Sequence, residues 1–276
     1  EIKEGCDVTQ QKESLARITY QRFFRRYRHL CGMTGTAWEV RGELGNVYGL
    51  TVARIPTNRP LLRIRHPDRV GPTLQAKYEA VLKRVRDLHQ SGRPVLVGTR
   101  SVSVSEEISR LFYETGMPHQ VLNAKNDRDE AEIIARAGEY GNITIATNMA
   151  GRGTDIKLGA GVKELGGLHV ILTERHDAGR IDRQLTVRCA RQGDPGSYEA
   201  FLSREDPILE GKWGSNMTWF IRKTLPPDWN IWTVAVKTAI LLAQKRIEHV
   251  HARMRHELLK VDEKIGRTLS FSGTRE

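Results

Sequence analysis

Cysteine is scarce in this chain of 276 residues, which contains only Cys6, Cys31 and Cys189. Three widely separated thiols are too few for a disulfide framework, and their spacing does not fit a zinc cluster. We therefore expect a protein of a reducing compartment such as the cytosol. No metal site is expected in the chain.

Long hydrophobic runs are also missing. The longest, residues 231–243, is interrupted by Lys237 and falls short of the ~20 apolar residues that cross a bilayer, so no membrane span is expected. The chain opens at Glu1 without a basic and then apolar leader. We therefore expect no secretory signal and expect the chain to be part of a longer protein.

A phosphate-binding loop is the third absence. No G-x-x-x-x-G-K-[ST] segment occurs, and no Asp-Glu pair ends a predicted buried strand. The first of these features cradles the phosphates of ATP, and the second holds magnesium. The chain by itself is therefore predicted not to hydrolyse ATP.

Basic residues, in contrast, are abundant. Lysine and arginine number 44 against 33 acidic residues, which gives a formal charge of +11, and 39% of the residues are hydrophobic. The length allows one large or two smaller globular domains. The charge favours phosphates, nucleic acid or anionic lipid as partners.

Short β-branched segments alternate with segments of helical period. We predict strands at 94–98, 120–122, 142–147, 168–172 and 198–202, and helices at 73–91, 103–116, 130–139 and 181–189. Residues 55–60 read as an extended connector, because two prolines restrict the backbone. Apolar residues then recur every three or four positions from Val236 to Leu269, which predicts a helix of ~55 Å. The expected fold is α/β, a parallel sheet flanked by helices and followed by a long helix.

Two segments have residue types suited to binding a nucleotide. Residues 147–156 (TNMAGRGTDI) follow a predicted strand, and ligands of open α/β sheets bind beyond the carboxyl ends of strands. Arg152 suits an anion and Asp155 a ribose hydroxyl, although a glycine-rich turn with a helix cap explains the segment equally well. Arg188 and Arg191 lie three residues apart, so on a helix they would share a face. Their guanidinium groups suit a γ-phosphoryl group, but a solvated basic face is the ordinary alternative.

Together these segments closely resemble the SecA preprotein-translocase ATPase family. The resemblance is carried by Gly32–Ala37 (GMTGTA), Ile55–Pro60 (IPTNRP), Pro94–Thr99 (PVLVGT), Val121–Lys125 (VLNAK), Thr144–Ile156 (TIATNMAGRGTDI), Gly167–His169 (GLH), Ile181–Ser197 (IDRQLTVRCARQGDPGS) and Ala243–Glu248 (AQKRIE).

The resemblance implies a RecA-like motor of two lobes in which ATP binds between the lobes and drives preproteins through a Sec-type channel. Residues 1–54 would be the tail of the first nucleotide-binding lobe, 55–210 the second RecA-like lobe and 211–276 a helical scaffold. The first lobe, upstream of Glu1, would hold the phosphates and Mg²⁺ of the ATP. An anionic membrane surface is a further expected partner and nucleic acid is not, and the expected location is cytoplasmic, peripheral to the inner membrane.

The resemblance also implies roles for particular residues. Arg188 and Arg191 fall on the arginine-finger motif, and Gly153 and Asp155 fall on the nucleotide-contacting loop. Three further residues fall on motifs that couple the nucleotide state to closure of the lobes, namely Gly98, Thr99 and Gln184.

The sequence departs from the family pattern at Val187 and Ala190, where the family has glycine. Two alternative functions are considered beside the SecA-like motor. One is the second lobe of a superfamily-2 nucleic-acid helicase, which shares the paired arginines. The other, suggested by Val187 and Ala190, is a degenerate module that senses nucleotide or docks a partner without hydrolysing ATP.

Overall fold

The structure is a computed structural model that describes residues 18–122, 130–147, 150, 153–210, 212–224 and 230–269. Its elements in chain order are α1 (Tyr20–Phe24), the 3-10 helix η1 (Ala37–Val40), α2 (Arg41–Tyr48), β1 (Arg63–Arg65), β2 (Arg69–Gly71), α3 (Leu74–Gln90), β3 (Val95–Thr99), α4 (Val102–Glu114), β4 (Gln120–Leu122), α5 (Glu130–Arg136), β5 (Ile143–Thr147), β6 (Leu168–Leu172), α6 (Gly179–Thr186), β7 (Gly196–Ser203), the 3-10 helix η2 (Pro207–Leu209), α7 (Lys212–Thr224) and α8 (Asn230–Leu269). They fall into two compact units, residues 54–249 and residues 1–53 with 250–276.

The larger unit is built on a parallel sheet with the strand order β1-β7-β6-β3-β5-β4. β2 also pairs with β7, so β1 and β2 follow one another along the same edge. Strands β3, β5 and β6 are buried along their whole length. This burial explains why apolar residues predominate in all three strands of the sequence.

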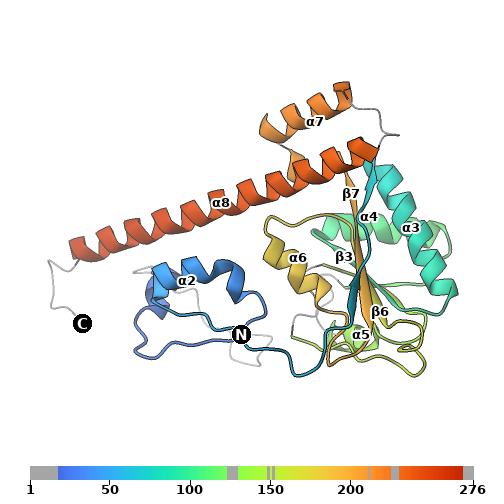
Figure 1. The fold of residues 1–276 in the computed structure, drawn as a ribbon, viewed down its shortest axis with the longest axis horizontal. Coiled ribbons are helices and arrows are strands. Elements are labelled where there is room, and N and C mark those ends of the chain that lie inside the picture. The colour runs from blue at the N-terminus through green and yellow to red at the C-terminus, as the bar shows by residue number, and fades with distance from the viewer. Residues whose placement is uncertain are drawn as a thin grey trace, which may run out of the picture. The chain divides into compact units, whose positions relative to one another are not determined.

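Two hydrophobic cores cover the two faces of the sheet, and successive strand residues point into opposite cores. Val95 and Val97 of β3 belong to the core that also contains buried residues of α3 and α4, whereas Leu96 belongs to the core that contains buried residues of α5, α6, α7 and α8. Figure 1 shows α3 and α4 on one side of the sheet and α6 on the other. The predicted fold class, a parallel sheet flanked by helices and followed by a long helix, is confirmed.

Several boundaries differ from the sequence prediction. Helix α4 begins at Val102, one residue before the predicted start at 103, because the Ser101 hydroxyl accepts the hydrogen bond of the Val104 N–H at 3.3 Å. Helix α6 ends at Thr186 and not near Cys189. The edge strands β1 and β2 and the helices α2 and α7 were not predicted. The sequence also predicts an N-cap at Asp127 for the helix at 130–139, and this residue lies outside the described residues.

The smaller unit combines α1, η1 and α2 with the second part of α8. Arg255 of α8 makes two hydrogen bonds with the Glu43 carboxylate, at 2.6 and 2.8 Å, and Thr19 donates to Asp262 at 2.6 Å. These contacts join segments more than 200 residues apart in the sequence. Within the described ranges, no helix combines the length and the apolar character that crossing a membrane requires.

The lobe boundaries expected at residues 54 and 210 concern a complete motor and stay predictions. The larger unit includes α7 and the first part of α8.

Candidate functional site: the two ends of helix α6

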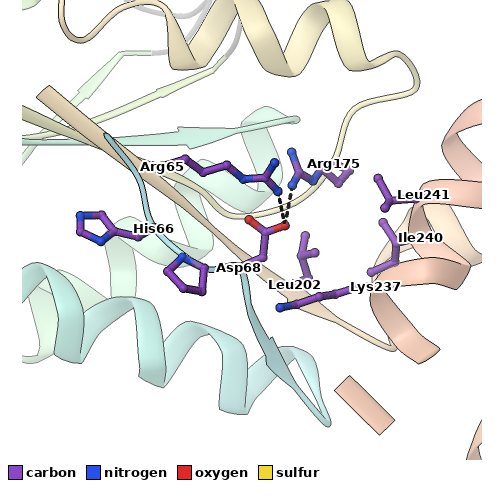
Figure 2. Close-up of a pocket in the computed structure, with 9 residues that line it drawn as sticks. Arg65, His66, Asp68, Arg175, Leu202, Lys237, Ile240 and Leu241 are labelled. Atoms are coloured by element: carbon purple, nitrogen blue, oxygen red, sulfur yellow. Dashed lines mark hydrogen bonds and ion pairs between the residues drawn. The ribbon is translucent and has the colours of Figure 1, made fainter. Parts of the chain in front are cut away.

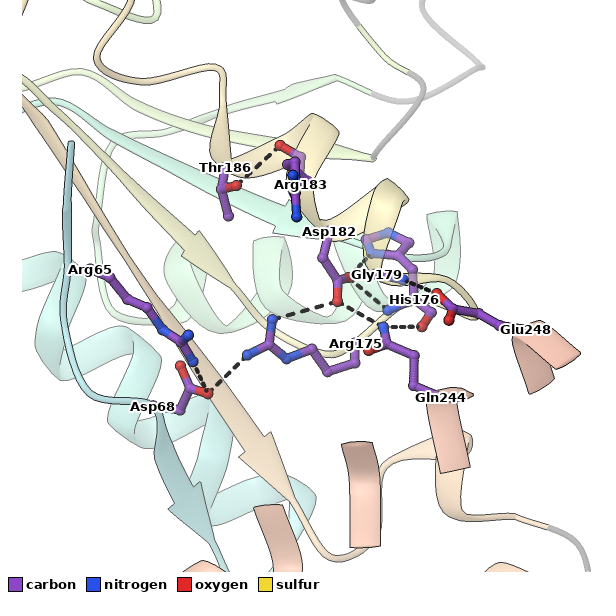
Figure 3. A network of polar contacts seen from close by, with 10 residues as sticks. All are labelled: Arg65, Asp68, Arg175, His176, Gly179, Asp182, Arg183, Thr186, Gln244 and Glu248. Carbon is purple, nitrogen blue, oxygen red and sulfur yellow. Dashed lines mark hydrogen bonds and ion pairs between the residues drawn. The ribbon is translucent and has the colours of Figure 1, made fainter. Parts of the chain in front are cut away.

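The start of helix α6 is capped by a carboxylate from α8. The Gly179 N–H donates to Glu248 Oε1 at 2.6 Å (Figure 3). The N-cap residue, Ala178, has no side chain that accepts such a bond. The negative charge also lies at the positive end of the helix dipole. The first part of α8 therefore fixes where α6 begins.

One turn further on, the buried Asp182 is the centre of a polar network. Its Oδ1 accepts from the backbone N–H of His176 at 2.9 Å and lies 2.8 Å from His176 Nδ1. Its Oδ2 accepts from Gln244 Nε2 at 2.9 Å, and the same amide donates to the His176 carbonyl at 2.8 Å. Figure 3 shows these groups converging from α6, α8 and the loop after β6.

Glycine 98 lets α6 approach the sheet closely. A Cβ at this position of β3 would lie 2.1 Å from Leu185 Cδ2, far inside van der Waals contact. Thr99 is fully buried, and its hydroxyl donates to the Ser101 carbonyl at 3.3 Å. Gly98 and Thr99 thus face the protein interior. Gly98 acts on α6 by packing.

Beyond the end of α6, the chain turns through an uncommon backbone conformation. Ala190 has φ 54° and Gln192 has φ 56°, and Gly193 follows with φ 81°. The left-handed region costs a non-glycine residue roughly 1–2 kcal/mol. Ala190 is one of the positions where the family pattern has glycine, and this turn gives the physical reason for that pattern.

The turn places both predicted arginines at one cavity. Arg188 is buried, with 7% exposure. The Arg191 side chain donates from Nε to the Val187 carbonyl and from NH1 to Asp155 Oδ1, both at 3.0 Å. The sequence predicts that the two arginines share a helix face. They do not, because α6 ends at Thr186, before both of them. They meet at the cavity through the turn.

This cavity, which we call the arginine cavity, has a volume of about 410 Å³. Its charged lining consists of Asp155, Lys157, Lys163, Arg188, Arg191 and Asp194. Lys163 pairs with Asp194 at 2.6 Å and Arg191 with Asp155, which leaves an excess of positive charge. Such a lining suits a polyphosphate.

Cys189 also lines the arginine cavity, and burial raises the pKa of its thiol to about 11. The thiol is therefore protonated at neutral pH and is a poor nucleophile. Among the described residues, no group of three His, Cys, Asp or Glu side chains is placed to hold a metal ion.

The position of Asp155 corrects one expectation. The sequence placed the segment after β5 beyond the carboxyl ends of the strands. Asp155 instead lines a cavity beside Leu168, the first residue of β6. The chain has turned back by this point, since the Gly159 N–H donates to the Gly138 carbonyl near the start of β5.

Of the predicted site residues, the structure thus brings Asp155, Arg188 and Arg191 together. Gly153 is exposed with φ 92°, and Gln184 is half-buried on α6; neither lines the cavity. Arg152 lies outside the described residues. Sequence reasoning missed Asp182, His176, Gln244 and the two cavity lysines.

The parallel sheet with helices on both faces, together with the arginine cavity beside α6, defines a RecA-like α/β lobe. Residues 60–162 and 160–226 match the SecA P-loop domain, and residues 1–45 match the SecA DEAD-like domain. The chain therefore belongs to the SecA family.

Relatives in several bacteria are similar over nearly the whole chain. The protein translocase subunit SecA 2 of Bordetella avium is 51% identical over 273 residues, which cover 99% of this chain and 41% of that protein. The SecA 2 subunit of Nitrosospira multiformis is 46% identical over 279 residues, covering 100% and 41%. The chain thus spans about two fifths of the length of these relatives. Among solved structures, the Escherichia coli DEAD-box protein SrmB is similar with a TM-score of 0.43 at 24% identity, over 55% of this chain and 85% of that chain.

Proposed function

We propose that this chain is the second motor lobe and the start of the helical scaffold of an ATP-driven preprotein translocase. One observation carries the proposal: Arg188, Arg191 and Asp155, which come from two separate motifs, line the same cationic cavity. In this assignment, residues 1–54 end the first lobe, 55–210 form the second lobe and 211–276 begin the scaffold.

The two arginines would act on the phosphates of ATP bound between the lobes. A guanidinium group near the γ-phosphate stabilises the negative charge that develops in the transition state. Arg191 is half-exposed and paired with Asp155, whose side chain is 44% exposed. Exposed pairs of this kind are worth at most about 1 kcal/mol, so a phosphate group can displace Asp155 at little cost. Asp155 then becomes available to a ribose hydroxyl, with Gly153 beside it.

ATP needs groups that this chain does not contain. The phosphate loop and the Mg²⁺ ligands would come from the first lobe, upstream of Glu1. When bound, Mg²⁺ would neutralise part of the phosphate charge. The lining of the arginine cavity complements such a first lobe, since it carries an excess of positive charge and the described residues include no cluster of three side chains placed to hold a metal ion.

Helix α6 would transmit the nucleotide state to the rest of the lobe. Gly98 sets the distance between α6 and β3, and Thr99 continues that strand. Gln184 lies on α6, between the anchored start and the arginines. A phosphate that binds Arg188 or Arg191 would therefore shift the end of α6 and change the contacts of this helix with β3 and α8.

For the complete motor, we propose preproteins as the substrate and a Sec-type channel as the partner. The basic charge is consistent with docking on an anionic membrane surface from the cytoplasmic side of the inner membrane. Membership of the SecA family favours this function over the helicase alternative, so nucleic acid is not proposed as a partner.

The test is ATP turnover by the complete motor, in which the chain is joined to its first lobe. Replacing Arg191 with alanine should lower the turnover rate by about 10³-fold or more, because an arginine finger contributes 10³–10⁵ to the rate. The matched control is Arg86→Ala, an exposed arginine of α3 on the other face of the sheet; its turnover should equal that of the wild type.

Retained turnover in the Arg191→Ala motor would remove this residue from the mechanism. A complete motor without any ATPase activity would instead support the degenerate module. Circular dichroism of each variant separates these results from a loss of fold.

A further inference from the structure

A second cavity lies in the larger unit, at the opposite end of the strands from the arginine cavity. Its volume is about 380 Å³. Arg65 and Asp68 come from the edge of the sheet, Arg175 follows β6, and Lys237, Ile240 and Leu241 come from α8 (Figure 2). Cavities of this size hold small molecules. We call it the edge cavity.

Its charged lining consists of three cations and one carboxylate. Arg65 and Arg175 both donate to the same oxygen, Asp68 Oδ2, at 3.2 and 2.8 Å. The negative charge of Asp68 is thus shared between two guanidinium groups. The third cation, Lys237, forms no hydrogen bond or ion pair with any residue that the structure describes.

Lys237 has an unusual setting for a lysine without a partner. It is half-buried and interrupts the longest apolar run of the chain, and Ile240 and Leu241 lie one turn further along the same helix. Leu202 of β7 completes an apolar wall next to it. Keeping an ammonium group in such surroundings costs solvation energy unless an anion approaches it.

A second, independent observation points to a ligand. Asp68 Oδ1 and Arg175 Nε are buried and lack a hydrogen-bond partner among the described residues. The Asp68 side chain is only 10% exposed. Buried polar atoms are nearly always satisfied in folded proteins. One free acceptor and several cationic donors therefore line a single cavity.

We propose that the edge cavity binds a small molecule that carries an oxyanion, a phosphate or a carboxylate, next to a hydroxyl group. The oxyanion contacts Lys237 and Arg65, and the hydroxyl donates to Asp68. The apolar wall accommodates the carbon skeleton. This inference is independent of the translocase function, because the cavity does not include Arg188 or Arg191.

The test is a titration of the 276-residue chain followed by amide NMR signals of Lys237 and Leu241. Two probes distinguish the oxyanions: glycerol 3-phosphate carries a phosphate and hydroxyls, and lactate carries a carboxylate and a hydroxyl. We expect saturable shifts with one of them. Lys237→Gln should weaken this binding by about tenfold or more, because a charge-assisted hydrogen bond is worth about 1.5–3 kcal/mol.

Two matched variants locate the binding. Lys245→Gln removes an exposed lysine of the same helix, and Arg191→Gln alters the arginine cavity; both should bind the probe as the wild type does. Unchanged binding by Lys237→Gln, loss of binding in Arg191→Gln, or the absence of a saturable shift with both probes would each overturn the proposal. A loss confined to Arg191→Gln would place the anion in the arginine cavity and leave the proposed function intact.

Discussion

The two ends of helix α6 are held in opposite ways. At the start, Glu248 caps Gly179, and the buried Asp182 accepts hydrogen bonds from His176 and Gln244. At the far end, Arg191 meets Asp155 in an exposed pair after a turn with positive φ values. Buried polar networks are costly to break, whereas exposed ion pairs exchange partners easily. One end of α6 is therefore an anchor and the other an adaptable binding surface.

The largest expected effect tests the anchor. Replacing Asp182 with alanine leaves several buried donors without an acceptor, so the free energy of unfolding should fall by about 3–5 kcal/mol. The matched variant Asp155→Ala, at the adaptable end, should lose less than about 1 kcal/mol. Urea denaturation measures both. Equal decreases in the free energy of unfolding would contradict the division of α6 into an anchored end and an adaptable end.

The next effect concerns the contact between α6 and the sheet. Gly98→Ala places a methyl group against Leu185, and overpacking of this kind costs about 1–3 kcal/mol of the free energy of unfolding. In a Leu185→Ala background the same change should cost almost nothing, because the space has been vacated. A double-mutant cycle gives the coupling energy. Additive losses would show that Gly98 does not act through α6.

A smaller effect, of opposite sign, is expected in the turn after α6. Ala190→Gly removes a left-handed strain of roughly 1–2 kcal/mol and adds chain entropy worth about 0.4–1 kcal/mol to the unfolded state. The unfolding free energy should therefore rise, by at most about 1.6 kcal/mol. Ala80→Gly, inside the regular helix α3, should lower it by about 1 kcal/mol. Thermal melts of the two variants should shift in opposite directions.

The smallest effect is that of Arg191→Ala on stability. Its pair with Asp155 is exposed, so the free energy of unfolding should change by only 0.2–1 kcal/mol, about the value of surface pairs. This contrasts with the large loss of turnover expected in the complete motor. A destabilisation of several kcal/mol would mean that Arg191 belongs to the anchor and is not available to a ligand.

Much of the sheet could be predicted from the sequence. Strands β3, β5 and β6 are buried on both faces, so each appears as a short, mostly apolar segment. The edge strands β1 and β2 escaped prediction because they have three residues each, are rich in arginine and depend on pairing with β7. The end of α6 was predicted at residue 189, three residues beyond its actual end at Thr186. The left-handed turn that follows was not recognised because its positive φ values occur at Ala190 and Gln192, whereas glycine is the usual residue for this conformation.

The candidate site was predictable only in part. Arg188, Arg191 and Asp155 were recognised through motifs that the chain shares with the SecA family. The anchor of α6 was not, because Asp182 and Gln244 lie 62 residues apart and no local pattern links a glutamine of a helix to a distant carboxylate. Lys237 was visible as a break in an apolar run, but its cavity depends on three separate elements.

The broken edge of the sheet has a consequence for behaviour in concentrated solution. β1 and β2 are separated by His66, Pro67 and Asp68, and proline has no backbone donor. A strand from another molecule would meet a short, interrupted row of hydrogen-bonding groups and the repelling charge of Arg63, Arg65 and Arg69. Natural sheets use such devices against edge-to-edge aggregation, so this border of the larger unit resists intermolecular strand addition.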